Sequence, residues 1–69
     1  MATAIITNVE DKGEVTVITY DDSKGAKNCH GIYDTKEVQS IQKVRGDLVG
    51  EEVLLYDTAN PLKPHIVFQ

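Results

Sequence analysis

The longest run of large, mostly apolar residues is Val53-Leu54-Leu55-Tyr56, inside the stretch 51–57. Gly50 precedes this stretch and an Asn-Pro pair follows it at 60–61, so residues that interrupt regular structure lie on both sides. A short apolar run bounded in this way is typical of a strand buried on both faces, because a half-buried strand alternates apolar and polar residues. The sequence therefore predicts a central strand over 51–57, with Leu54 in the core.

Two earlier segments, 3–9 and 14–20, are rich in β-branched residues, and 28–33 predicts a third, short strand. Glu10-Asp11-Lys12-Gly13 separates the first two segments and predicts a hairpin, because Gly takes the positive φ that a short turn needs. Gly31 interrupts the third segment and predicts an edge strand or a sharp bend. Residues 65–68 predict a final edge strand, because Pro64 removes a backbone donor.

Residues 34–45 fit two structures. As a helix, the segment would be capped by Asp34 or Thr35 and ended by Gly46. Its apolar positions, Val38, Ile41 and Val44, would then share one face. All three are β-branched and none is a strong helix former. We therefore interpret 34–37 as a helical turn and 38–45 as a strand.

The sequence also shows a weak internal repeat between 3–33 and 39–69, in which Val17 aligns with Val53 and Tyr20 with Tyr56. Such a repeat predicts two three-stranded units within a single small domain over 1–69. The expected fold class is all-β, with at most one short helix or helical turn near 34–45. Its architecture would be a small β-barrel or sandwich of five to six short strands.

Size predicts self-association. A chain of 69 residues buries a small core, and Cys29 is its only cysteine, so a disulfide within the chain is excluded. Strand edges without many blocking prolines would remain exposed. We therefore expect a homo-oligomer.

Charge limits the classes of partner. The sequence has 11 Asp and Glu against 7 Lys and Arg, a formal net charge of -4 at pH 7. Proteins that bind nucleic acid through phosphates carry the opposite sign, so we expect no direct binding of DNA or RNA. No apolar run reaches the roughly 20 residues of a membrane helix, and no signal-peptide pattern is present. With a lone cysteine, these features predict a cytoplasmic protein that does not bind membranes.

Cys29 and His65 are the strongest candidates for metal ligands, and the internal repeat aligns them. Their spacing matches no recurrent zinc pattern. His30 does not help, because adjacent residues of a strand point to opposite faces. An active site would need a pocket of roughly 300 Å³ or more. We therefore expect no catalytic residue, no metal site and no cofactor.

These patterns predict a small acidic, non-enzymatic module that acts by binding another protein, one with a basic surface. The carboxylates in two pairs and two tyrosines at strand ends are the candidate partner-binding residues: Asp21, Asp22, Glu51, Glu52, Tyr20 and Tyr56.

Two alternatives remain open. An inhibitor of the kind that phages and mobile elements encode would mimic nucleic acid and block a basic surface. It would need most of the surplus carboxylates on one face, namely Glu10, Asp11, Glu14, Asp21, Asp22, Asp47, Glu51 and Glu52. A barrel that binds a small molecule or a metal would instead use a rim of tyrosines, or Cys29 with His65.

Overall fold

The fold is a five-stranded antiparallel sheet with one helix, seen in a computed structural model that describes residues 2–56 and 65–68. The elements run in the order β1 (Ala2–Asp11), β2 (Val15–Asp22), β3 (Cys29–Asp34), α1 (Thr35–Arg45), β4 (Glu52–Tyr56) and β5 (His65–Phe68). Across the sheet the strand order is β3-β2-β1-β4-β5. The prediction was a small barrel or a sandwich, but the strands form one open sheet that is not closed into a barrel. A mostly β fold with one short helix is confirmed.

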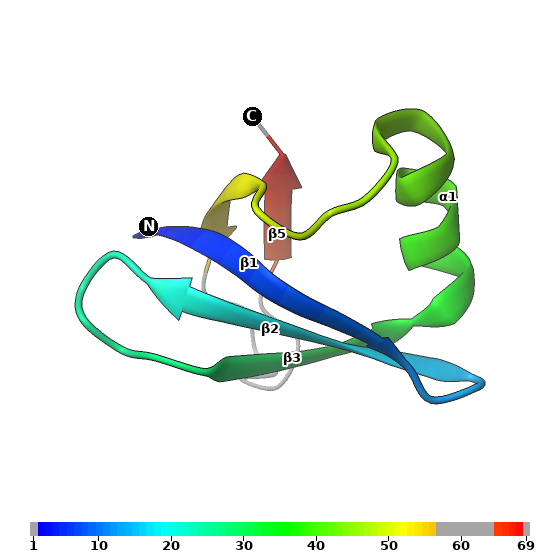
Figure 1. Cartoon of the computed structure of the whole chain (residues 1–69), viewed down its shortest axis with the longest axis horizontal. Coiled ribbons are helices and arrows are strands. Elements are labelled where there is room, and N and C mark those ends of the chain that lie inside the picture. The colour runs from blue at the N-terminus through cyan, green and yellow to red at the C-terminus, as the bar shows by residue number, and fades with distance from the viewer. Residues whose placement is uncertain (1, 57–64, 69) are drawn as a thin grey trace.

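The β1–β2 hairpin forms at the predicted place. The Asp11 Oδ1 atom accepts a hydrogen bond from the Gly13 N–H at 2.7 Å, and Gly13 has a φ of 104°. Further along β1 the register shifts between Ile6 and Asn8, which marks a β-bulge. Because a bulge bends a strand, β1 pairs with β2 along most of its length and with β4 near its start. Figure 1 shows the result: β4 and β5 stand steeply against β1–β3, and α1 rises on the same side.

The sheet has one buried face, called the inner face here, and a second, outer face. Alternate residues of β2 and β3 are buried, as expected for strands that cover a core on one side. The core residues are Ala4, Ile6, Ile18, Tyr20, Tyr33, Val38, Leu48 and Val53. A buried pair of hydroxyls, Thr16 and Thr35, lies 2.9 Å apart and satisfies its own polar atoms.

The predicted strand over 38–45 is wrong, because the whole segment Thr35–Arg45 is helical. Asp34 occupies the N-cap position without a side-chain capping bond, and Gly46 ends the helix with a φ of 78°. Glu37 lies in the first turn and Lys43 and Arg45 in the last, which is the order that the helix dipole favours. These end signals, together with packing, outweigh the poor helix propensity of the β-branched residues.

The apolar face that was expected for such a helix is only partly correct. Val38 is buried and Ile41 packs against the core, but Val44 is 86% exposed. At about 100° per residue, Val44 lies roughly 120° around the helix from Val38, whereas position 45 returns to within about 20°. Arg45 accordingly turns inward, with its guanidinium 4.9 Å from the centre of the Phe68 ring on β5.

The predicted central strand is also wrong in position. Residues 52–56 do form β4, but β1 is the middle strand of the sheet. On β4, Val53 is fully buried whereas Leu54 is half-buried on the outer face. In its described residues, the second predicted three-stranded unit has most of a helix and two strands. The edge positions predicted for the third and last strands are confirmed. Within the described part of the chain, no helix is long and apolar enough to cross a membrane.

Candidate protein-binding face

The outer face carries three of the six candidate partner-binding residues, and two of them, Asp21 and Glu52, flank one residue of β1. Ile5 on β1 is paired with Asp21 of β2 on one side and with Glu52 of β4 on the other. Residues directly opposite each other in an antiparallel sheet have their side chains on the same face. Ile5 is 40% exposed. The three residues therefore form a row, here called the acidic row, with an exposed apolar side chain between two carboxylates.

A row with apolar residues lies beside the acidic row on β4 and β5. Leu54 is paired with Thr3 on β1 and with Val67 on β5. The next pair is Tyr56 with His65, whose ring centres are 6.1 Å apart. Tyr56, another of the candidate residues, is therefore exposed on the same face as the acidic row.

The other half of the outer face is built by β2 and β3. Val17 is paired with Ile32, which is 40% exposed, and Val15 is paired with Asp34. Val15 is itself an exposed apolar residue. Ile5, Val15 and Ile32 were not among the site residues predicted from the sequence. Their common signal is an apolar residue on the outward position of a strand whose alternate residues are buried.

Lys and Arg are absent from the strands of the described chain. None of the five contains Lys or Arg, whereas β1 to β4 together carry six carboxylates: Glu10, Asp11, Asp21, Asp22, Asp34 and Glu52. The cations near the outer face come from turns: Lys12 lies 2.8 Å from Glu10, and Lys27 lies 4.0 Å from Asp21. Four of the six carboxylates lie on the outer face, which therefore combines exposed apolar side chains with negative charge: Glu10, Asp21, Asp34 and Glu52.

Several carboxylates hold turns together. Asp22 accepts a hydrogen bond from the Lys24 N–H at 2.8 Å, and Asp47 accepts one from the Val49 N–H at 3.0 Å. Asp21 accepts one from the Asn28 N–H at 3.0 Å while remaining on the outer face. Turn formation thus explains these aspartates locally. Of the candidate residues, Glu51 is also engaged, because its carboxylate lies 3.8 Å from the Arg45 guanidinium.

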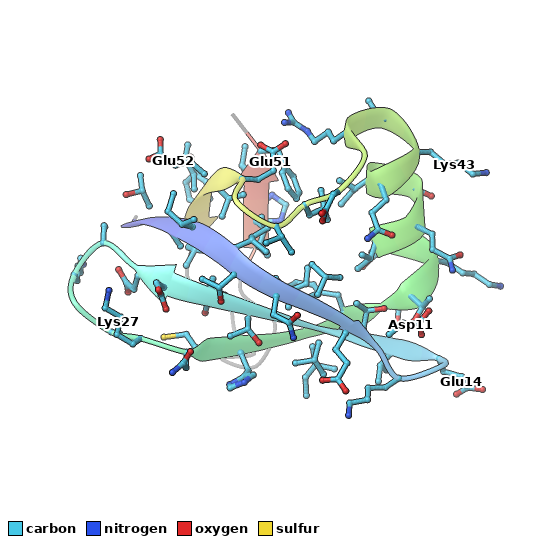
Figure 2. All side chains as sticks on the ribbon, viewed as in Figure 1. Asp11, Glu14, Lys27, Lys43, Glu51 and Glu52 are labelled. Carbon is cyan, nitrogen blue, oxygen red and sulfur yellow. The ribbon has the colours of Figure 1, made fainter. Side chains whose placement is uncertain are left out.

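The carboxylates that a nucleic-acid mimic would need are spread over the molecule. Asp11 and Glu14 lie at the β1–β2 turn, whereas Glu51 and Glu52 lie beside the start of β4 (Figure 2). The cation Lys27 lies at the end of the β1–β2 hairpin that is opposite Asp11 and Glu14. Asp11 and Asp22 are paired with the buried residues Thr16 and Ala4, so both belong to the inner side. No structural feature gathers all eight carboxylates on one face.

Tyr20 lies on the opposite side from Tyr56. It is buried on the inner face, opposite Cys29 of the neighbouring strand, and Tyr33 is buried on the same face. Burial raises the pKa of the Tyr20 hydroxyl, and negative charge on Cys29 and Asp22 raises it further. Burial also raises the pKa of Tyr33, with a smaller contribution from Tyr20. The three tyrosines thus do not share one rim.

These buried tyrosines predict a loss of stability at alkaline pH. In an unfolded chain, tyrosine ionises near pH 10. Because both hydroxyls titrate higher in the folded protein, their contribution is intact below about pH 10 and falls as the unfolded chain loses protons above it. The free energy of unfolding of Tyr33→Phe, measured in urea from neutral to strongly alkaline pH, should decline less steeply than that of the wild type. Equal slopes would contradict the placement of Tyr33.

Cys29 and His65 are not brought together as a pair of ligands on one face. Cys29 on β3 is half-buried and paired with Tyr20 of β2, whereas His65 on β5 is exposed and paired with Tyr56 of β4. These strands are the two opposite ends of the strand order. Among residues 2–56 and 65–68 there is no group of three or more His, Cys, Asp or Glu side chains that could hold a metal ion.

Comparison of the chain with protein-family models, with curated proteins and with solved structures found no match.

Proposed function

We propose that this protein is a small, non-enzymatic interaction module that binds another protein through its outer face. The observation that supports this proposal is the composition of that face. Ile5 is exposed between Asp21 and Glu52, further exposed apolar residues lie on both sides, and none of the described strands contains Lys or Arg. Exposed apolar side chains flanked by carboxylates on one face are compatible with a protein-binding site.

The same surface suggests the chemistry of the partner. Carboxylates around an apolar centre favour a protein with Lys or Arg around an apolar patch of its own. Complementary charge would steer the encounter, and the apolar contacts would hold the complex after docking. Within the proposal, Asp21, Glu52 and Tyr56 keep the partner-binding role expected from the sequence, and Ile5 joins them. Asp22 and Glu51 act in the turn and in the ion pair with Arg45.

A comparison of three baits tests the proposal. The outer-face bait carries Asp21→Asn and Glu52→Lys, because Asn keeps an oxygen that can accept the Asn28 N–H bond. The control bait carries Asp47→Asn and Glu14→Lys, which change the net charge by the same amount away from the outer face. Asp47 also accepts a backbone hydrogen bond in a turn, so the two Asp→Asn changes are matched.

We expect the wild type and the control bait to capture the same proteins from a cell extract, and the outer-face bait to lose a basic subset of them. Circular dichroism should show that all three baits are folded. If the outer-face bait captures what the wild type captures, or if both variants lose the same proteins, the outer face is not the binding site.

A further inference from the structure

Among the described residues, one row of backbone groups of β3 has no partner along the edge of the sheet. The Thr35 N–H donates to the Glu14 carbonyl at 3.2 Å, which continues the β2–β3 register by one pair. Hydrogen-bonded and non-hydrogen-bonded pairs alternate in an antiparallel ladder. Counting back from Thr35, the pairs that include Tyr33, Gly31 and Cys29 are hydrogen-bonded. The alternate residues, His30, Ile32 and Asp34, therefore direct their backbone N–H groups away from the sheet.

The side chains on that edge do not protect it. His30 and Ile32 are exposed on the outer face, and β3 contains neither Pro nor Lys, two residues that commonly block strand edges. The other edge, β5, is less available. It has four residues, and the Arg45 guanidinium lies over the Phe68 ring at its end.

We propose that β3 pairs with β3 of a second copy of this chain, antiparallel and with a two-fold axis at Ile32. This pairing sets Ile32 opposite Ile32 of the second copy. It also sets each His30 opposite Asp34 of the other copy, so an imidazole donor meets a carboxylate twice. The interface goes beyond the proposed binding of a different protein, because it requires no other component.

The chemistry of the edge selects this register. An axis at Asp34 would place two carboxylates opposite each other, and an axis at His30 would leave Asp34 without a counterpart. Only an axis at Ile32 pairs all three outward residues with a complementary group. On the inner side this register sets Gly31 opposite Tyr33 of the second copy, and each Tyr33 ring lies over the Gly31 of its own strand. On the outer side, the Val17–Ile32 rows of the two copies become one continuous apolar strip.

Four variants test the pairing by analytical ultracentrifugation. Ile32→Lys places two like charges at the axis, and Ile5→Lys is its control, because both Ile residues are 40% exposed on the outer face. His30→Asp sets carboxylates opposite each other, and the exchange of both residues, His30→Asp with Asp34→His, restores the complementary pairs.

We expect the wild type and Ile5→Lys to have twice the monomer mass at micromolar concentration, and Ile32→Lys to be monomeric. His30→Asp should weaken self-association by about tenfold or more, since two cross-strand pairs change together, and the exchange should restore it. A monomeric wild type would overturn the proposal, as would a dimer that survives Ile32→Lys. So would an exchange variant as weak as His30→Asp, because it would place the interface in another register. None of these variants alters Asp21 or Glu52, so this test and the three-bait test fail independently.

Discussion

Leu48→Ala is expected to lower the free energy of unfolding by about 2 to 5 kcal/mol, the range for Leu→Ala at fully buried sites. Leu48 lies in the connection between α1 and β4 and has an exposed fraction of 0%. It belongs to the core that α1 and the inner face share, so its truncation leaves a cavity between them. A domain of this size has about 3 to 10 kcal/mol of stability in total, so the variant should be largely unfolded at moderate urea concentration.

Leu54→Ala is the matched control, because it removes the same atoms from a half-buried position on the outer face. It should cost well under half as much as Leu48→Ala. The Leu54 side chain buries less apolar surface on folding, and its truncation leaves no closed cavity. Both variants should be compared with the wild type by urea unfolding at one protein concentration, because self-association would shift the midpoints. A larger loss for Leu54→Ala would restore the two-sided burial predicted from the apolar run 53–56.

Gly31→Ala is expected to cost about 1 to 3 kcal/mol, although Ala usually stabilises a strand relative to Gly. A β-carbon at position 31 would lie 2.5 Å from Cε2 and 2.6 Å from the hydroxyl oxygen of Tyr33. The Tyr33 ring covers Gly31 on the inner face and is itself buried, so it must shift within the packed core to make room. Urea unfolding measures the loss.

A double-mutant cycle with Tyr33→Leu separates this collision from other effects of the substitution. Once the ring is gone, Gly31→Ala should be neutral or stabilising, because Ala restricts the unfolded chain. An equal cost in both backgrounds would mean that the Tyr33 ring does not occupy the space over Gly31.

The sequence predicted the elements that short-range chemistry determines. Gly13 supplies the positive φ of the first hairpin, and the Asp11 carboxylate accepts the N–H of that glycine in the turn. Gly31 was correctly linked to an edge strand. The need for glycine at this position comes from the ring of Tyr33, which lies two residues away on the same face. These features involve residues that are close in sequence, so their pattern is visible without the fold.

The helix and the position of β4 depend on distant residues. The sequence of 38–45 is compatible with a strand, and packing decides for the helix: Val38 joins the core and Arg45 contacts Phe68. The apolar run 53–56 predicted a strand correctly, but its neighbours in the sheet depend on pairing with β1. Propensity alone does not resolve such choices.

The acidic row was predicted only in part. Asp21 and Glu52 were candidate residues because they belong to acidic pairs, yet their neighbour Ile5 was missed. The row exists because β1 pairs with β2 and β4 at the same residue, and that register depends on the bulge between Ile6 and Asn8. The lack of Lys and Arg in the strands becomes apparent only when the strand boundaries are known.

The rate of association with the captured partner, measured from low to high salt, tests the central claim most directly. If the outer face binds a basic partner, the association rate constant of the wild type should fall steeply as salt rises, because charges beyond about 8 to 10 Å are screened at physiological ionic strength. Asp21→Asn with Glu52→Lys should slow association far more than it speeds dissociation, and Asp47→Asn with Glu14→Lys should do so much less. An association rate that is unchanged across a tenfold salt range, or equally reduced in both variants, would contradict binding through the acidic row.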